Sequence, residues 1–246
     1  MEEKELKTSL KQRIFISVIA IVMVGTFIAS YAAILMSGNS SSSGSSETEG
    51  LSDERMAYYE QKYYTEVNEF KTATAGDYAI FAPYLSEITA YNETAANDNG
   101  VVSRDLLVGS GRELAEGDKD YLAYYVGWCA DETIFDSSLD SATNPAAFAS
   151  ALDASSGLIE GWETGIVGMK IGGVREITIP GNLAYGEQSE ICGGYNKPLK
   201  FIVMTKANEE PFATQVAELQ VASMMLQYAY YGVDYEVDFQ TETSAE

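Results

Sequence analysis

Histidine is absent from the 246 residues, and cysteine occurs only twice. A catalytic triad that depends on histidine is therefore impossible. So is a zinc site built from four cysteines, or from two cysteines and two histidines. Basic residues are also scarce, since 15 Lys and Arg stand against 37 Asp and Glu. Nucleic-acid affinity comes mainly from Lys and Arg, so we expect no nucleic-acid partner. We also predict neither a metal nor a cofactor.

Charged residues are missing from the apolar stretch 14–36. About 20 apolar residues suffice to cross the hydrocarbon core of a membrane as a helix. The stretch is longer than the apolar part of a signal peptide, which spans about 7–15 residues. Small residues at 29–32 resemble a cleavage site, but they lie inside the run. We predict an uncleaved transmembrane helix over 14–36, the alternative being a buried core helix.

The flanking charges predict the orientation of this helix. Lys4, Lys7, Lys11 and Arg13 precede it, and the next basic residue after it is Arg55. The positive-inside rule predicts a cytoplasmic tail over 1–13, a single-pass cell-membrane protein, and residues 37–246 outside the cytoplasm. Residues 37–50 are rich in Ser and Gly and predict a flexible linker.

Helical patterns flank the middle of the chain. Residues 51–100 predict a helical extension, whose apolar residues at helical spacing are Met56, Tyr59, Tyr63, Val67 and Phe70. A weaker helical pattern follows around Phe81 and Leu85, and Glu93–Gly100 favours a loop. Residues 209–232 predict a C-terminal helix, and 233–246 predict a frayed acidic tail.

Residues 101–208 have a different pattern, in which short β-branched and aromatic segments alternate with Gly and Asp turns. Strands are expected at 121–126, 175–179 and 199–203. One short helix is expected within 159–169. This organisation indicates one α+β domain between the helical flanks.

Several motifs occur in order within this domain. They are Gly109-x-Gly111, Gly117-Asp118, Tyr125-Val126-Gly127, Phe135-Asp136-Ser137-Ser138, Leu158-Ile159-Glu160-Gly161-Trp162-Glu163, Gly168-Met169-Lys170-Ile171-Gly172, Leu183-Ala184-Tyr185-Gly186 and Leu199-Lys200-Phe201. Each alone is weak, but the ordered set resembles the FKBP family of peptidyl-prolyl cis-trans isomerases. The resemblance implies a twisted antiparallel sheet wrapped around one short helix, with proline-containing unfolded or partly folded polypeptides as partners.

The resemblance also implies a site between the helix and the sheet. Its catalytic residues would be Trp162 as the floor under the proline ring, Asp136 at the wall, and Tyr185, whose hydroxyl binds a substrate carbonyl. Its substrate-binding residues would be Tyr125, Phe135, Phe148, Leu158, Ile159 and Phe201. Taken singly, each aromatic residue is as compatible with an ordinary core, and only the order of the motifs favours a site.

Such a site needs neither a nucleophile nor a metal. Rotation about a peptide bond faces a barrier of about 18–20 kcal/mol, because resonance holds the bond planar. A dry aromatic surface favours the twisted, less polar amide, and fixed donors can hold the neighbouring carbonyls. An isomerase that assists folding of secreted or cell-surface proteins is the expected function. A non-catalytic peptide-binding or chaperone module on the same fold is the alternative.

The loop at 187–195 departs from the family, which usually has an Ile-Pro-Pro-like stretch there. In the fold that the resemblance implies, Cys129 ends the strand bearing Tyr125, and Cys192 lies in the loop after Tyr185, which folds back toward the same rim. An oxidising location outside the cytoplasm favours a Cys129–Cys192 disulfide. Two separate buried thiols are the alternative.

Overall fold

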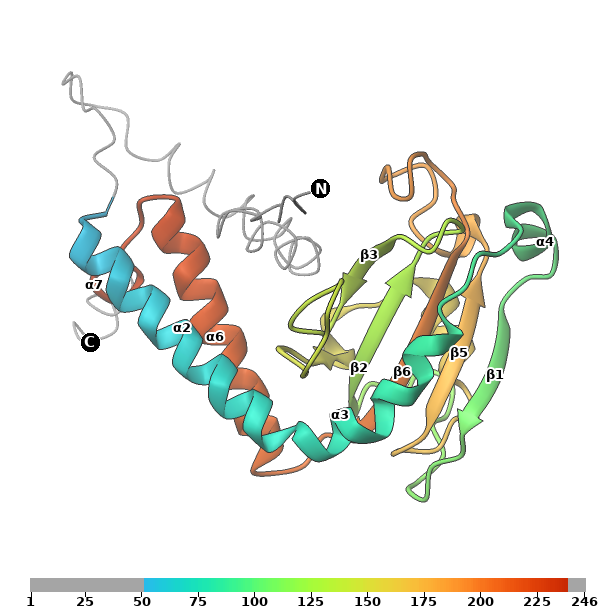
Figure 1. The fold of residues 1–246 in the computed structure, drawn as a ribbon, viewed down its shortest axis with the longest axis horizontal. Coiled ribbons are helices and arrows are strands. Elements are labelled where there is room, and N and C mark those ends of the chain that lie inside the picture. Colours follow the sequence, from blue (N-terminus) through green and yellow to red (C-terminus); the bar gives the residue numbers. More distant parts are fainter. Residues whose placement is uncertain (1–50, 239–246) are drawn as a thin grey trace, which may run out of the picture.

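The computed structural model describes residues 51–238 (Figure 1). The predicted cytoplasmic tail, transmembrane helix and linker, at 1–13, 14–36 and 37–50, lie outside the described residues, as do residues 239–246 of the acidic tail. Among the helices of residues 51–238, none is long and apolar enough to span a bilayer.

A six-stranded antiparallel sheet forms the centre of the molecule. Its strands are β1 (Val102–Leu107), β2 (Tyr121–Trp128), β3 (Ile134–Ser137), β4 (Leu152–Asp153), β5 (Val174–Ile179) and β6 (Leu199–Ala207). The strand order is β1-β5-β6-β2-β3, with β4 also paired to β2. The strands expected from the sequence lie within β2, β5 and β6.

One short helix, α5 (Glu160–Ile166), packs on one face of this sheet. Gly161 and Gly165 allow a close approach, because a Cβ atom on either would lie 2.2 and 2.4 Å from Ile179 and Ile177, respectively. The helix is shorter than the expected segment 159–169, and Gly168 beyond its end has a positive φ of 77°. The predicted sheet wrapped around one helix is therefore confirmed.

The opposite face of the sheet is covered by the N-terminal extension. Alternate residues of β2 point to the two faces, with Tyr121 and Tyr125 on the α5 side and Tyr124 and Trp128 on the other. The second face packs against α3 (Ala75–Phe81) and the 3-10 helix η1 (Ala82–Glu87), where Phe81 is fully buried. This double covering explains why every residue of β2 is buried.

The helices α2 (Asp53–Ala73) and α6 (Phe212–Tyr230) lie side by side and extend away from the sheet (Figure 1). The Phe70 and Phe212 rings stack 5.8 Å apart where the pair meets the sheet, and both approach Tyr124. At the far end, Tyr59 is buried against Leu226. The two predicted helices thus bury their apolar stripes against each other.

Two local expectations are wrong. Part of the loop expected at Glu93–Gly100 is the helix α4 (Glu93–Asp98), because the Asn92 side chain accepts a hydrogen bond from the Ala95 amide at 2.9 Å and caps it. The tail expected to be frayed contains α7 (Tyr235–Asp238). Asp234 beside it is paired with Arg55 at 2.5 Å, which fastens this end of the chain to α2.

Candidate functional site

Four aromatic rings from separate elements meet between α5 and the sheet. Tyr125 comes from β2, Phe135 from β3, Trp162 from α5 and Phe201 from β6. The Trp162 ring lies 5.6 Å from Tyr125 and 5.3 Å from Phe201, and Phe135 lies 5.6 Å from Phe201, all edge to face. Such edge-to-face pairs are favourable and fix the orientation of each ring. The structure therefore brings together the floor and the main walls that the sequence predicts.

Gly127 makes room for two of these rings. A Cβ atom there would lie 2.7 Å from both the Phe135 and the Phe201 ring, closer than real contacts allow. The glycine of the Tyr125-Val126-Gly127 motif is therefore explained by the close approach of the rings to the backbone of β2.

The Trp162 side chain is held in place by a residue that the sequence reasoning missed. Its indole N–H donates a hydrogen bond to the Tyr121 hydroxyl at 3.2 Å, and Trp162 is only 3% exposed. Tyr121 points to the same face as Tyr125, because side chains on one strand alternate between its faces. That alternation was the signal available in the sequence, since it places residues 121 and 125 on the same face of β2.

Asp136 lies beside this cluster on β3. Its carboxylate accepts a hydrogen bond from the Tyr125 hydroxyl at 2.5 Å. Burial raises the pKa of Asp136 to about 6, and the Tyr125 hydrogen bond offsets only part of that rise. Burial, together with the nearby Asp136 charge, also raises the pKa of the Tyr125 hydroxyl well above its usual value. At neutral pH the site therefore contains one carboxylate and a neutral phenol that donates to it.

The remaining predicted residues are only partly buried. Leu158, Ile159 and Tyr185 pack against the same cluster and are partly exposed to solvent. Burial raises the pKa of the Tyr185 hydroxyl to about 12, with a smaller contribution from the Asp136 charge, so it is a neutral donor. Within residues 51–238, neither this hydroxyl nor the Ile159 amide donates to another protein group. Two donors thus remain available beside an apolar surface.

Phe148 does not belong to this cluster, so its prediction as a substrate-binding residue is corrected. It is fully buried on the opposite face of the sheet, where its ring stacks on Tyr124 at 4.0 Å. Phe81 also packs against it at 5.2 Å. The physical reason is the N-terminal extension, which provides an aromatic core on that second face.

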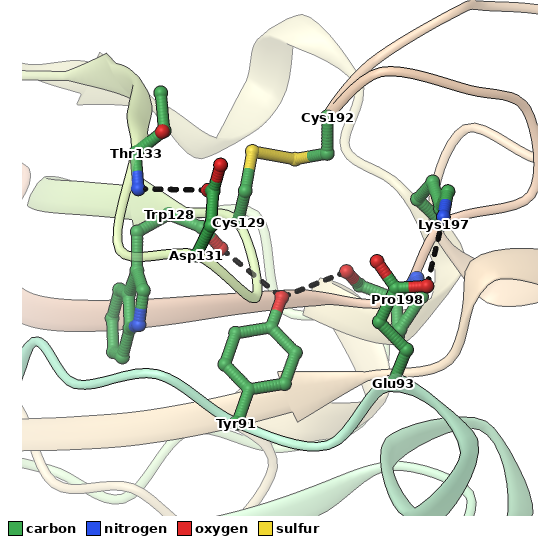
Figure 2. Close-up of a disulfide and its surroundings, with 9 residues drawn as sticks. All are labelled: Tyr91, Glu93, Trp128, Cys129, Asp131, Thr133, Cys192, Lys197 and Pro198. Atoms are coloured by element: carbon green, nitrogen blue, oxygen red, sulfur yellow. Dashed lines mark hydrogen bonds and ion pairs between the residues drawn. A yellow bond between two sulfur atoms is a disulfide. The ribbon is translucent and has the colours of Figure 1, made fainter.

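The predicted Cys129–Cys192 disulfide is confirmed (Figure 2), with the two Cα atoms 5.4 Å apart. It joins the end of β2 to the loop that follows Tyr185. Ile191, which precedes Cys192 and was not predicted as a site residue, packs against the buried core on the α5 side of the sheet, which includes the aromatic rings. Within the described part of the chain, no group of three or more His, Cys, Asp or Glu could hold a metal ion.

Residues 111–206 match the family described as FKBP-type peptidyl-prolyl cis-trans isomerase. A curated relative, the FK506-binding protein of Neisseria meningitidis serogroup B, is 39% identical over 99 residues, covering 40% of this chain and 84% of the relative. The chain belongs to the FKBP family of peptidyl-prolyl cis-trans isomerases. The FK506-binding protein of serogroup A strain Z2491 is 37% identical over 98 residues, covering 40% of this chain and 84% of the relative.

Solved structures include similar chains. The crystal structure of AtFKBP13 matches 44% of this chain and 92% of its own length, with 29% sequence identity and a TM-score of 0.34. The reaction of this isomerase family is rotation about prolyl peptide bonds, which needs no covalent intermediate. The family match covers the aromatic cluster, Asp136 and Tyr185, whereas α2, α3, α4 and α6 lie outside it.

Proposed function

We propose that this FKBP-type isomerase is anchored in the cell membrane by residues 14–36 and acts outside the cytoplasm on secreted or cell-surface proteins as they fold. The observation that carries the proposal is the uncharged apolar run, with basic residues before it and a Ser/Gly-rich tether after it. The disulfide supports the location, because such bonds persist mainly in oxidising compartments. The expected substrates are proline-containing segments, whose uncatalysed isomerisation takes tens of seconds and limits folding.

We further propose the role of each site residue. Trp162 supports the proline ring, and Tyr125, Phe135 and Phe201 surround it with apolar surface. The Ile159 amide and the Tyr185 hydroxyl donate to substrate carbonyls next to the rotating bond. Because these donors are fixed before the substrate arrives, they can stabilise the twisted amide without reorganisation.

The location is tested on intact cells that express the full-length chain with a tag at residue 1. Added protease should remove everything beyond the tether at 37–50 and leave a short tagged stub in the membrane fraction. The matched control is a variant with Lys4, Lys7, Lys11 and Arg13 replaced by Asn. This variant should insert in both orientations, so the protease should remove the domain from only part of its molecules. Complete protection of the wild-type chain, or its release into the medium, would contradict the proposal.

The residue roles are tested with Trp162→Phe and Tyr185→Phe. Each should lower kcat/KM for a Leu-Pro peptide about tenfold, which corresponds to about 1.4 kcal/mol of lost transition-state stabilisation. Trp128→Phe, the same change on the opposite face of the sheet, and Tyr231→Phe, on a tyrosine that is 73% exposed, are the matched controls. Equal activity of the site variants and their controls would refute the assigned roles.

A further inference from the structure

The loop 186–196, which leads from Tyr185 toward β6, has an unusual backbone. Gly186, Cys192, Gly193 and Asn196 all have positive φ angles, and that of Cys192 is 59°. Cys192 and Gly193 are the two central residues of a tight turn, in which the Ile191 amide donates to the Gly194 carbonyl at 3.0 Å and the Gly194 amide donates to the Ile191 carbonyl at 3.3 Å. These hydrogen bonds hold the shape of the turn but not its position against the rest of the domain. The only covalent constraint on the loop is its disulfide to Cys129.

The other end of that disulfide is firmly held. Cys129 is 5% exposed and follows the central strand β2. Its amide donates to the Thr133 carbonyl at 2.9 Å, and its carbonyl accepts from the Glu132 amide at 3.0 Å. The bond therefore ties an irregular loop to a rigid turn at the edge of the sheet (Figure 2).

A segment of the N-terminal extension braces the same region. The Tyr91 hydroxyl lies 3.2 Å from the Trp128 carbonyl and 2.8 Å from the Pro198 carbonyl, so it spans the ends of β2 and β6 (Figure 2). Glu93 pairs with Lys197 at 2.8 Å, just beyond the loop. These contacts hold the C-terminal end of the loop, and the Asn196 amide closes its base by donating to the Gly186 carbonyl at 2.7 Å. The disulfide is the covalent link between the turn at its middle, around Ile191, and the end of β2.

The middle of the loop touches the site. Ile191 and Cys192 pack against the cluster that contains Trp162 and Phe201, and Tyr185 lies immediately before the loop. A shift of residue 192 would therefore move the Ile191 side chain relative to the surface on which the proline ring is proposed to bind. Ile191 is thus the direct neighbour of the disulfide-bonded Cys192, and both residues pack against this cluster.

We propose that the Cys129–Cys192 disulfide is a positioning device for substrate binding, which holds Ile191 against the aromatic cluster. The proposal rests on the site roles given above. Reduction adds two electrons and two protons, breaks the S–S bond and leaves two thiols, while a dithiol reductant closes to its own disulfide. The reduced chain stays folded but binds peptide more weakly and selects less strongly for an apolar residue before proline.

The experiment compares the oxidised and the dithiothreitol-reduced full-length chain in detergent, using NMR exchange on Leu-Pro and Glu-Pro peptides. Reduction should raise KM for Leu-Pro about tenfold, the size expected for one lost hydrophobic contact, and change kcat by less than about twofold. Selectivity for Leu-Pro over Glu-Pro should fall, and reoxidation should restore both quantities. The double variant Cys129→Ser with Cys192→Ser is the matched control, and should have the reduced values with or without dithiothreitol.

A second variant separates positioning from general support of the fold. Ile191→Ala in the oxidised chain should raise KM to a similar extent, and reduction of that variant should add little, because both changes remove one contact. Additive effects would overturn the proposal, as would an unchanged KM in a reduced chain with native near-ultraviolet circular dichroism. Global unfolding on reduction would also overturn it, since the bond would then be purely structural. All of these measurements use purified protein, so their failure would leave the proposed location untouched.

Discussion

Asp136 makes the stability of the domain depend on pH in a direction opposite to that of most acidic residues. Burial raises its pKa from the ordinary 3.8 to about 6. The folded chain therefore keeps this proton to a higher pH than the unfolded chain does. Stability from this group is fully present below about pH 4 and is lost as the pH rises through 6, because the unfolded state then binds fewer protons than the folded state.

The size of the effect follows from the shift. One pKa unit corresponds to about 1.4 kcal/mol, so a shift of roughly two units costs about 3 kcal/mol once the carboxylate is fully ionised. Between pH 4 and pH 7 the change is about 2 kcal/mol, because at pH 4 an unfolded aspartate is already partly ionised. Asp136→Asn removes the titration but keeps an oxygen that can accept from the Tyr125 hydroxyl.

Urea unfolding at pH 4, 5, 6 and 7 measures this difference. The free energy of unfolding of the wild-type chain should fall by about 2 kcal/mol relative to Asp136→Asn over that range, because subtraction removes the contribution of every other acid. Asp131→Asn is the matched control, since a backbone hydrogen bond from Thr133 lowers the pKa of Asp131 and its contribution has the opposite sign. Parallel curves for wild type and Asp136→Asn would refute the assignment of a raised pKa.

Two further predictions concern packing and the disulfide. Gly127→Ala should displace the Phe135 and Phe201 rings and lower kcat/KM about tenfold, measured by a peptide isomerisation assay with Gly76→Ala, which meets no atom within 4 Å, as control. Loss of the Cys129–Cys192 bond, which spans 63 residues, should lower the free energy of unfolding by about 4 kcal/mol in urea. A loss below about 1 kcal/mol would show that the unfolded chain is little constrained by this bond.

The sequence predicted the parts of the fold that follow from local patterns. Side chains two residues apart on a strand point to the same face. Ile177 and Ile179 of β5, and Leu199 and Phe201 of β6, have this spacing, and both pairs lie on the α5 face of the sheet as it predicts. The helical spacing in 53–70 and 212–230 likewise predicted two helices. The family motifs placed Trp162 and Tyr125 at one cluster, although neither residue alone distinguishes a site from a core.

The misses came from contacts between segments far apart in the chain. Phe148 is aromatic and follows β3, so spacing alone allowed it on either face, and only the packing of Phe81 on the second face decided its place. The helix α4 was missed because its capping residue, Asn92, also suits a turn. The order around α7 was missed because Asp234, which precedes this helix, pairs with Arg55 at the opposite end of the described residues.

The covering of the second face means that the domain's physical boundary differs from the boundary defined by similarity. The family match begins at residue 111, but a chain cut there would expose Tyr124 and Trp128, both fully buried in the complete structure. It would also remove the Thr89 carbonyl that accepts the Trp128 indole hydrogen bond at 3.1 Å. The smallest unit suited to expression or crystallisation therefore includes α2, whose Val67 and Phe70 are buried in the same core as Tyr124 and Trp128.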